Sequence, residues 1–414
     1  MSQQSTADAV AMRRNLRLLP AHQALASTLA WLPIFVLFTR GWFGIDGALQ
    51  LAGIFYFTTV IVEVPSGWAS DRLGRVVTLK AAAVAMALAH VFFVISDGSF
   101  ALVALGEVML ATGFSAISGT DVSLHYDTLE ELGIEAEYEE RQSKLTAISF
   151  AAVSASAVVG GLIGWASLEL VFAFSVVSSV LQFIVLWWLA EPPQRRAGDA
   201  GQNFGSQLSS CLSYLRRPFL RWVLMFWIAM VTLEHVAFTL AQPYLTEALG
   251  FTFDDIGSTP VWTGFLFAVF SLIGAVAARN AASLRRRFGF LPLLLGLAVL
   301  SASIISAMLI VLSVWVALFM GLRSVLGAVA PTVLTSEIAP AVEQQHRATY
   351  LSIHSLAGRL VYGGLTYAAA VAIGDDLMAT IGLFTIASWI LIALVIAGWV
   401  ALRPTLPAAV TSVT

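Results

Sequence analysis

The sequence predicts an all-α membrane protein of twelve transmembrane helices, arranged as two pseudo-symmetric six-helix bundles. Of its 414 residues, 58% are hydrophobic and only 11% are charged, and the mean hydropathy is +0.85. Soluble domains are about one-quarter charged. Apolar stretches of about 20 residues, the length a helix needs to cross about 30 Å of hydrocarbon, recur along the chain with polar breaks between them. The alternating pattern of a membrane barrel is not seen, so helices are the predicted spanning elements.

The predicted helices, in chain order, lie at 19–40, 47–69, 76–96, 100–126, 143–164, 168–190, 219–245, 260–281, 289–311, 314–337, 348–373 and 377–402. The tail before the first helix is polar, and that helix lacks a small-residue cleavage site, so we expect no signal peptide. If the N-terminus is inside, all 22 Lys and Arg residues except Arg40, Arg323 and Arg359 fall on the cytoplasmic side or within a turn of it. The positive-inside rule therefore predicts that both termini are cytoplasmic.

A hydrophilic stretch divides the chain into an N-terminal bundle at 1–190, a linker at 191–217 and a C-terminal bundle at 218–414. The linker contains prolines and glycines but also a helical stripe of Phe204, Leu208, Leu212 and Leu215. This stripe predicts an interfacial helix on the inner leaflet, with a merely surface-exposed linker as the alternative. The halves also echo each other, because DRLGR at 71–75 follows the second helix and RRFGF at 286–290 follows the eighth. Parallel six-helix repeats of this kind occur in secondary transporters.

Several kinds of chemistry receive no support from the sequence. Cys211 is the only cysteine, so neither an intrachain disulfide nor a thiolate metal cluster can form. The chain has no GxxxxGK[ST] phosphate loop and no HExxH zinc motif, and no two histidines have metal-ligand spacing. We therefore expect no metal site, no cofactor and no nucleic-acid partner, and the expected partners are a small-molecule substrate, protons and the lipid bilayer.

Charged residues interrupt the apolar pattern between the second and third predicted helices. The spacing Gly67-x-x-x-Asp71-Arg72-x-Gly74-Arg75 resembles the signature loop of the major facilitator superfamily. Twelve spans, inside termini and a central linker agree with that resemblance over the whole chain. Further segments are similar to a subgroup of bacterial drug-exporter-like members, namely Glu63-Val64-Pro65-Ser66-Gly67, Ser118-Gly119-Thr120-Asp121, Tyr126-Asp127 and Arg347-Ala348-Thr349-Tyr350-Leu351-Ser352.

The resemblance implies that this loop is a latch at the inner gate. Asp71 would face the positive N-terminal end of the helix that begins near Arg347, and Arg75 would bridge Asp71 to Asp127. Breaking this network would release the inner gate. Gly74, like Gly67, would allow close backbone approach.

Two of the loop's basic residues have a simpler interpretation. Arg72 and Arg75 could serve only as positive-inside anchors, as basic loop residues generally do. The glycine spacing around them favours the latch.

Four charges lie at or near mid-span, where none should face lipid: Glu107, Glu234, Arg323 and Arg359. The resemblance implies that the first, fourth, seventh and tenth helices line a central cavity, and three of these residues lie on those helices. The glutamates are candidate proton carriers, with Glu234 first. The alternative is that a glutamate pairs permanently with an arginine as a structural contact.

Other polar residues in the spans keep two interpretations. Glu63 is a candidate for proton binding or for structural pairing to the second half. Asp121 is a candidate for protonation or for polar packing among small hydroxyl residues. His235 either tunes Glu234 or is a satisfied core histidine, because it projects about 100° around the helix from its neighbour.

Aromatic side chains are plentiful on the candidate cavity helices. Trp31 and Phe35 on the first helix and Trp227 on the seventh are candidate cavity residues, and the alternative is a lipid-facing or interfacial position. If they line a cavity, they favour amphipathic or aromatic substrates over sugars.

The resemblance implies a monomeric secondary transporter of the bacterial inner membrane, and we expect proton-coupled export of a small organic molecule by alternating access. An importer or facilitator of a small organic nutrient is the nearest alternative, and a transport-dead sensor or a membrane-embedded enzyme is the alternative from another class. Two departures weaken antiport: Met109 occupies a position where many proton-coupled exporters carry arginine, and the fifth helix lacks their proline.

Overall fold

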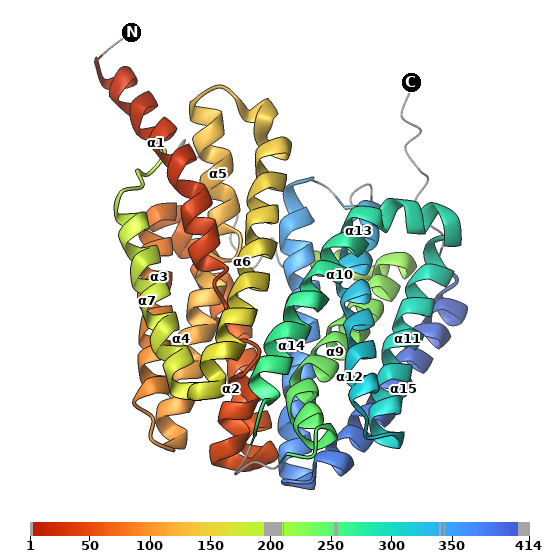
Figure 1. Cartoon of the computed structure of the whole chain (residues 1–414). Helices are drawn as coiled ribbons and strands as arrows, with labels where there is room; N and C mark the ends of the chain where they lie inside the picture. Colours follow the sequence, from red (N-terminus) through yellow and green to blue (C-terminus); the bar gives the residue numbers. More distant parts are fainter. Residues whose placement is uncertain are drawn as a thin grey trace. The chain divides into compact units, whose positions relative to one another are not determined.

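The computed structural model describes residues 3–193, 209, 211–251, 256–338, 341–342 and 344–404. Side chains are described throughout this part except for residues 3–7, Asp71, Glu139 and residues 344–349. All regular elements in these ranges are helices, as the apolar periods predict (Figure 1). Phe204 and Leu208 of the predicted linker helix lie outside the described residues.

The elements, in chain order, are α1 (Gln3–Ala26), α2 (Phe35–Leu73), α3 (Arg75–Val94), α4 (Phe100–Ile117), α5 (Thr120–Glu131), η1 (Glu135–Glu137), α6 (Tyr138–Ala166), α7 (Leu168–Trp187), η2 (Tyr214–Arg216), α9 (Pro218–Ala248), α10 (Thr259–Phe288), α11 (Phe290–Ile310), α12 (Val314–Phe319), η3 (Met320–Leu322), α13 (Arg323–Ile338), α14 (Gln344–Ile373) and α15 (Leu377–Leu402).

Eleven segments among these residues are long and apolar enough to span a membrane, so the chain is a multi-pass membrane protein. The first predicted helix, 19–40, is not continuous, because the backbone leaves helical geometry between α1 and α2. The chain then turns at Gly44, whose φ of 69° and ψ of −177° favour glycine, inside the long segment α2. The sequence prediction was therefore wrong about the continuity of this helix.

The chain forms two compact units. The first contains Met1–Arg196 and Phe253–Ser271, and the second contains Ala197–Thr252 and Leu272–Thr414. In the first unit, α3 packs most extensively against α4 and α7, and α4 also packs against α2. In the second unit, α9 is the central helix and packs against α14, α15, α13 and α11.

An aromatic cluster forms the core of the first unit. The rings of Phe38 and Phe172 lie 4.7 Å apart, and Phe93 lies 5.1 Å from Phe172. All three side chains are fully buried. Burying such rings contributes about 1.5–3 kcal/mol each, so the cluster fixes α2, α3 and α7 against one another.

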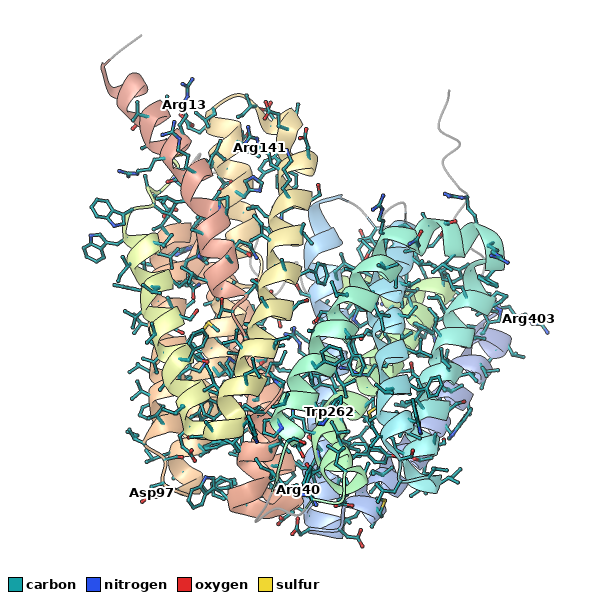
Figure 2. The ribbon with its side chains drawn as sticks, viewed as in Figure 1. Arg13, Arg40, Asp97, Arg141, Trp262 and Arg403 are labelled. Carbon is teal, nitrogen blue, oxygen red and sulfur yellow. The ribbon has the colours of Figure 1, made fainter. Side chains whose placement is uncertain are left out.

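The two ends of the first unit carry different side chains. Figure 2 shows Arg13 and Arg141 at one end and Arg40 and Asp97 at the opposite end. Arg13 and Arg141 belong to the basic set on which the predicted orientation rests.

Candidate functional site

The signature turn of the first unit lies between α2 and α3. Gly74 has a φ of 112°, a conformation that side chains other than glycine rarely adopt. Directly after it, Arg75 Nε donates a hydrogen bond to Asp127 Oδ2 on α5 at 3.2 Å, and Arg75 Nη1 donates to Ser70 Oγ at 3.3 Å. The Arg75–Asp127 contact implied by the resemblance is therefore present in the structure.

A residue that the sequence analysis did not single out completes this turn. The Glu191 carboxylate accepts hydrogen bonds from the backbone N–H groups of Arg75, at 2.6 Å, and Val76, at 2.8 Å. These are the first, otherwise unpaired N–H groups of α3, where the helix dipole favours an anion. A Cβ added to Gly74 would lie 2.9 Å from this carboxylate, so glycine is required here for contact as well as for conformation.

The segment that carries Glu191 is itself held in place. Asn15 on α1 donates from Nδ2 to the Ala190 carbonyl at 2.7 Å and accepts at Oδ1 from the Ala190 N–H at 2.9 Å. Asn15 is fully buried. This pair of hydrogen bonds positions Glu191 at the start of α3.

The remaining latch candidates are placed differently. The Arg72 guanidinium stacks 4.7 Å from the ring centroid of Trp68, which is exposed, so Arg72 has the geometry of an interfacial anchor. Gly67 is not closely approached, since a Cβ there would meet open space among the described residues. The side chains of Asp71 and Arg347 lie outside the described residues, and the implied contact of Asp71 therefore stays a prediction.

The second unit contains a similar pair at the end of α10. Arg285 is hydrogen-bonded and ion-paired to Glu337 on α13, and Glu337 is buried. Arg285 directly precedes the RRFGF stretch that echoes the signature loop. Each unit therefore joins two helix ends through an arginine and a carboxylate.

Glu234 on α9 lies among the other mid-span charges of the second unit. Arg323 Nη1 donates to the main-chain carbonyl of Glu234 at 3.2 Å rather than to its carboxylate, and the Arg323 guanidinium lies 5.5 Å from the ring of Phe238. No described residue forms a hydrogen bond or an ion pair with the Glu234 carboxylate. The carboxylate instead lies against Gly327 of α13, where an added Cβ would collide with it.

His235 and Tyr362 continue this cluster. His235 Nδ1 lies 2.7 Å from the Val231 carbonyl, so Nδ1 carries the proton and donates it. The Tyr362 hydroxyl donates to the His235 carbonyl at 3.2 Å and lies 2.7 Å from Thr239 Oγ1. Glu234, Arg323 and Arg359 all act electrostatically on His235, so the four predicted residues lie near one another in the second unit. Arg323 is buried and the other three are half-buried.

The carboxylates of the first unit are placed separately. Glu107 is buried on α4, 2% exposed, and its carboxylate has no hydrogen bond or ion pair with any described residue. Glu63 is half-buried and interacts with other residues, and its main-chain carbonyl accepts a hydrogen bond from Ser66 at 2.9 Å. Asp121 is in the first turn of α5, and its Oδ1 accepts a hydrogen bond from the N–H of the next residue, Val122, at 2.8 Å. Burial and the Asp121 charge raise the pKa of the neighbouring Tyr138 phenol.

The aromatic candidates are mostly packed. Trp31 lies 5.4 Å from Phe35, and Phe35 lies 5.4 Å from Phe93, so both belong to the aromatic core of the first unit. Trp227 of the second unit packs edge-on against His354 at 5.7 Å and remains half-buried.

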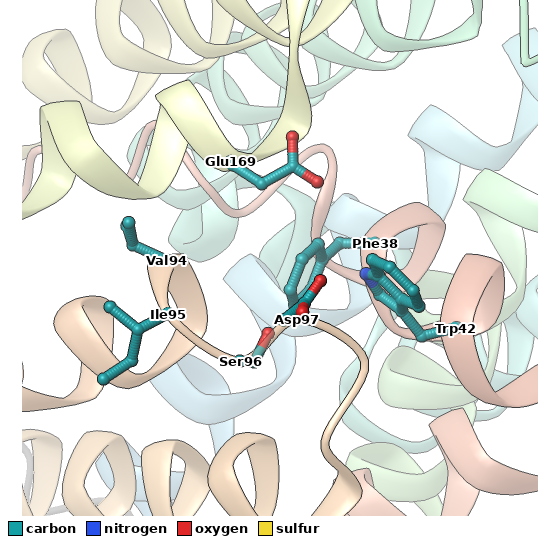
Figure 3. A pocket seen from close by; sticks show the side chains of 7 residues that line it. All are labelled: Phe38, Trp42, Val94, Ile95, Ser96, Asp97 and Glu169. Atoms are coloured by element: carbon teal, nitrogen blue, oxygen red, sulfur yellow. The ribbon is translucent and has the colours of Figure 1, made fainter.

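A cavity of about 290 Å³ opens at the end of the first unit that carries Asp97 (Figure 3). It is lined by Phe38, Trp42, Val94, Ile95, Ser96, Asp97 and Glu169. None of the predicted site residues lines it. Asp97 lies in the loop between α3 and α4 and Glu169 in the first turn of α7, and no motif in the sequence links the two carboxylates.

These features define a class before any comparison: a multi-pass helical membrane protein with two helical units and buried charges in its spans. The family model of the Major Facilitator Superfamily matches residues 24–365, and the chain belongs to this superfamily. Membership indicates a transporter rather than an enzyme, as predicted. A comparison with curated protein sequences finds no match.

Solved structures of superfamily transporters share the fold. A mutant of the nucleoside transporter NupG has a TM-score of 0.77 at 11% identity, over 94% of this chain and 100% of that chain. A D-xylose-proton symporter has a TM-score of 0.68 at 15% identity, over 96% and 98%. A POT family transporter in complex with 5-aminolevulinic acid has a TM-score of 0.68 at 10% identity, over 94% and 96%. At these identities the likeness shows the fold alone.

Proposed function

We propose that this transporter couples the movement of a small organic molecule to protons by alternating access, with export as its direction and Glu234 as the proton carrier. The observation that carries the proposal is the Glu234 carboxylate, which lies half-buried in a spanning helix without a hydrogen bond or ion pair from any described residue.

The physical argument is a balance between burial and charge. A charged side chain at the centre of a span costs about 2.5–3.5 kcal/mol on insertion scales, and protonation removes that cost for a carboxylate. Arg323 bonds the Glu234 main chain, which leaves the carboxylate to exchange its proton. A free-energy difference of a few kcal/mol between the protonated and ionised forms is enough to bias a two-state equilibrium.

The cluster also supports a polar organic substrate. Around Glu234 it offers a guanidinium from Arg323, the imidazole of His235 and the hydroxyl of Tyr362. Buried groups of this kind give specificity when a ligand satisfies them. The neighbours named for nucleosides, D-xylose and 5-aminolevulinic acid suggest polar molecules for the first screening panel.

Sequence features support the proposed direction of transport and the proposed location. The similarity of Glu63–Gly67 and Ser118–Asp121 to drug-exporter-like members favours export, and import or facilitated entry of a nutrient is the alternative. We also propose that both termini are cytoplasmic, because this orientation fits the distribution of Lys and Arg. The resemblance to bacterial members supports a monomer in the inner membrane of a bacterial cell.

The proposal is tested in liposomes that contain purified protein and a pH-sensitive dye. Nucleosides, pentoses, amino acids, organic anions and lipophilic cations are added one at a time, and proton flux is recorded for the wild type, Glu234→Gln and Glu107→Gln. We expect at least one compound to trigger proton flux that Glu234→Gln abolishes. Transport without proton flux, unchanged in both variants, would contradict coupling and leave a facilitator.

A further inference from the structure

The Glu234 carboxylate lies directly against the backbone of Gly327. Gly327 lies on α13, one helical turn after Arg323, so the two residues share a face of that helix. Arg323 holds the main chain of Glu234 through its carbonyl. The side chain of Glu234 then passes to the position of Gly327, where the missing Cβ leaves the space that its carboxylate occupies.

We propose that Gly327 is a positioning residue for proton coupling: the absence of a side chain there leaves the space in which the Glu234 carboxylate lies against the backbone of α13. The inference rests on the proposed role of Glu234. Any side chain at position 327 would occupy this space and move the Glu234 carboxylate relative to the charged groups around it.

Those charges come from two helices besides α9. Arg323 lies on α13, Arg359 and Tyr362 lie on α14, and His235 follows Glu234 on α9 itself. Two other long helices, α11 and α15, and the short helix α12 also pack against α9. None of these three helices contains a titratable residue. A displacement of the carboxylate by the width of a methyl group changes its distance to each charged neighbour, and electrostatic energies vary inversely with distance.

The substitution Gly327→Ala separates this role from a structural one. Alanine is a better helix former than glycine, and the atoms that its Cβ would meet are the far end of a flexible side chain. The variant should therefore unfold at the wild-type temperature or above it. A matched control is Gly296→Ala on α11, because a Cβ there meets open space.

The Glu234→Asp substitution provides the reciprocal change. It withdraws the carboxylate by one methylene, which makes room for the Cβ of residue 327. The double variant Gly327→Ala with Glu234→Asp should therefore come closer to wild-type behaviour than Gly327→Ala alone.

The readout requires no substrate. Full-length protein in lipid is titrated with acid while the carbonyl stretching band of protonated carboxyl groups is followed by infrared spectroscopy, and the band missing in Glu234→Gln is assigned to Glu234. We expect Gly327→Ala to move the midpoint of this band by about one pH unit, a tenfold change in proton affinity, and the double variant to restore it partly. Gly296→Ala should leave the midpoint unchanged.

The outcomes distinguish the two proposals. An unchanged midpoint in Gly327→Ala, or a shift that Glu234→Asp does not reduce, would overturn the positioning role of Gly327. A wild-type protein whose Glu234 band titrates normally but whose transport moves no protons would overturn the proposed function and leave the Gly327 contact intact. If Gly327→Ala cannot be purified, the double variant is tested alone. A midpoint close to that of Glu234→Asp supports the positioning role, and a double variant that also fails to fold would overturn it.

Discussion

At the scale of single residues, Glu191 shows how a distant side chain completes a motif. The signature loop supplies Gly74 and Arg75, but the carboxylate that caps α3 comes from a position 116 residues beyond Arg75. Spacing within the loop predicts the turn, and the resemblance to the superfamily signature implies the Arg75–Asp127 contact. It contains no information about a partner from the end of α7, and only the three-dimensional arrangement supplies it.

A first prediction concerns this cap. Glu191→Ala removes the acceptor for two N–H groups at the positive end of α3, so we expect a loss of about 1–2 kcal/mol in stability. Thermal unfolding of the purified protein in detergent measures it. Glu135→Ala, in the exposed helix η1, is the control and should change stability by less than about 0.5 kcal/mol. Equal unfolding temperatures for the two variants would contradict the capping role.

At the scale of elements, the break between α1 and α2 is the main feature that hydropathy did not predict. Ser156 Oγ on α6 accepts a hydrogen bond at 3.0 Å from the Leu29 N–H, which lies in the break. The Ala30 carbonyl packs directly on Gly160, one turn further along α6. Non-helical backbone in a spanning region requires such polar partners and close approach, and α6 provides both.

A second prediction tests this contact. Gly160→Ala would place a Cβ in collision with the Ala30 backbone, which cannot move aside as a flexible side chain can. We expect a loss of about 1–3 kcal/mol, the usual effect of overpacking. The comparison is Gly364→Ala on α14, where a Cβ meets open space. Equal unfolding temperatures for Gly160→Ala and Gly364→Ala would show that the Ala30–Gly160 contact does not require glycine.

A third prediction concerns Ser156 alone. Ser156→Ala leaves the Leu29 N–H without its hydroxyl partner, so we expect a loss of about 1 kcal/mol, in the range for a buried unsatisfied donor. Thermal unfolding again measures it. Ser156→Thr, which keeps the hydroxyl, should remain closer to the wild type than Ser156→Ala, and the reverse order would exclude the hydrogen bond as the reason.

The sequence predicted most of the helices because twenty-residue apolar stretches have few alternatives in lipid. The bounds 289–311 and 377–402 agree closely with α11 and α15. Hydropathy does not reveal the break between α1 and α2, because most residues of the break are apolar. Pro33 is a signal for an interrupted helix that a hydropathy average does not register. For the site, mid-span charge singled out Glu234, Arg323 and Arg359, whereas nothing in the sequence distinguishes Gly327 from the glycines of the other spanning helices.

At the scale of the whole molecule, the central claim is that Glu234 links protons to substrate movement. In the proposed mechanism, ionised and protonated Glu234 each stabilise a different conformation of the transporter, so a proton gradient would drive net transport only if Glu234 gains and loses its proton. Replacing it with glutamine, which stays neutral, should remove the driving force while leaving the conformational cycle available.

The decisive experiment uses proteoliposomes that contain Glu234→Gln and a substrate identified in the proton-flux screen described above. Two rates are measured on the same proteoliposomes: substrate transport driven by a pH gradient, and exchange of substrate without a gradient. We expect transport driven by a pH gradient to fall to the level of empty liposomes, while exchange of labelled for unlabelled substrate across the membrane continues near the wild-type rate. If the gradient-driven transport of Glu234→Gln equals that of the wild type, Glu234 is not the proton carrier and the claim is contradicted.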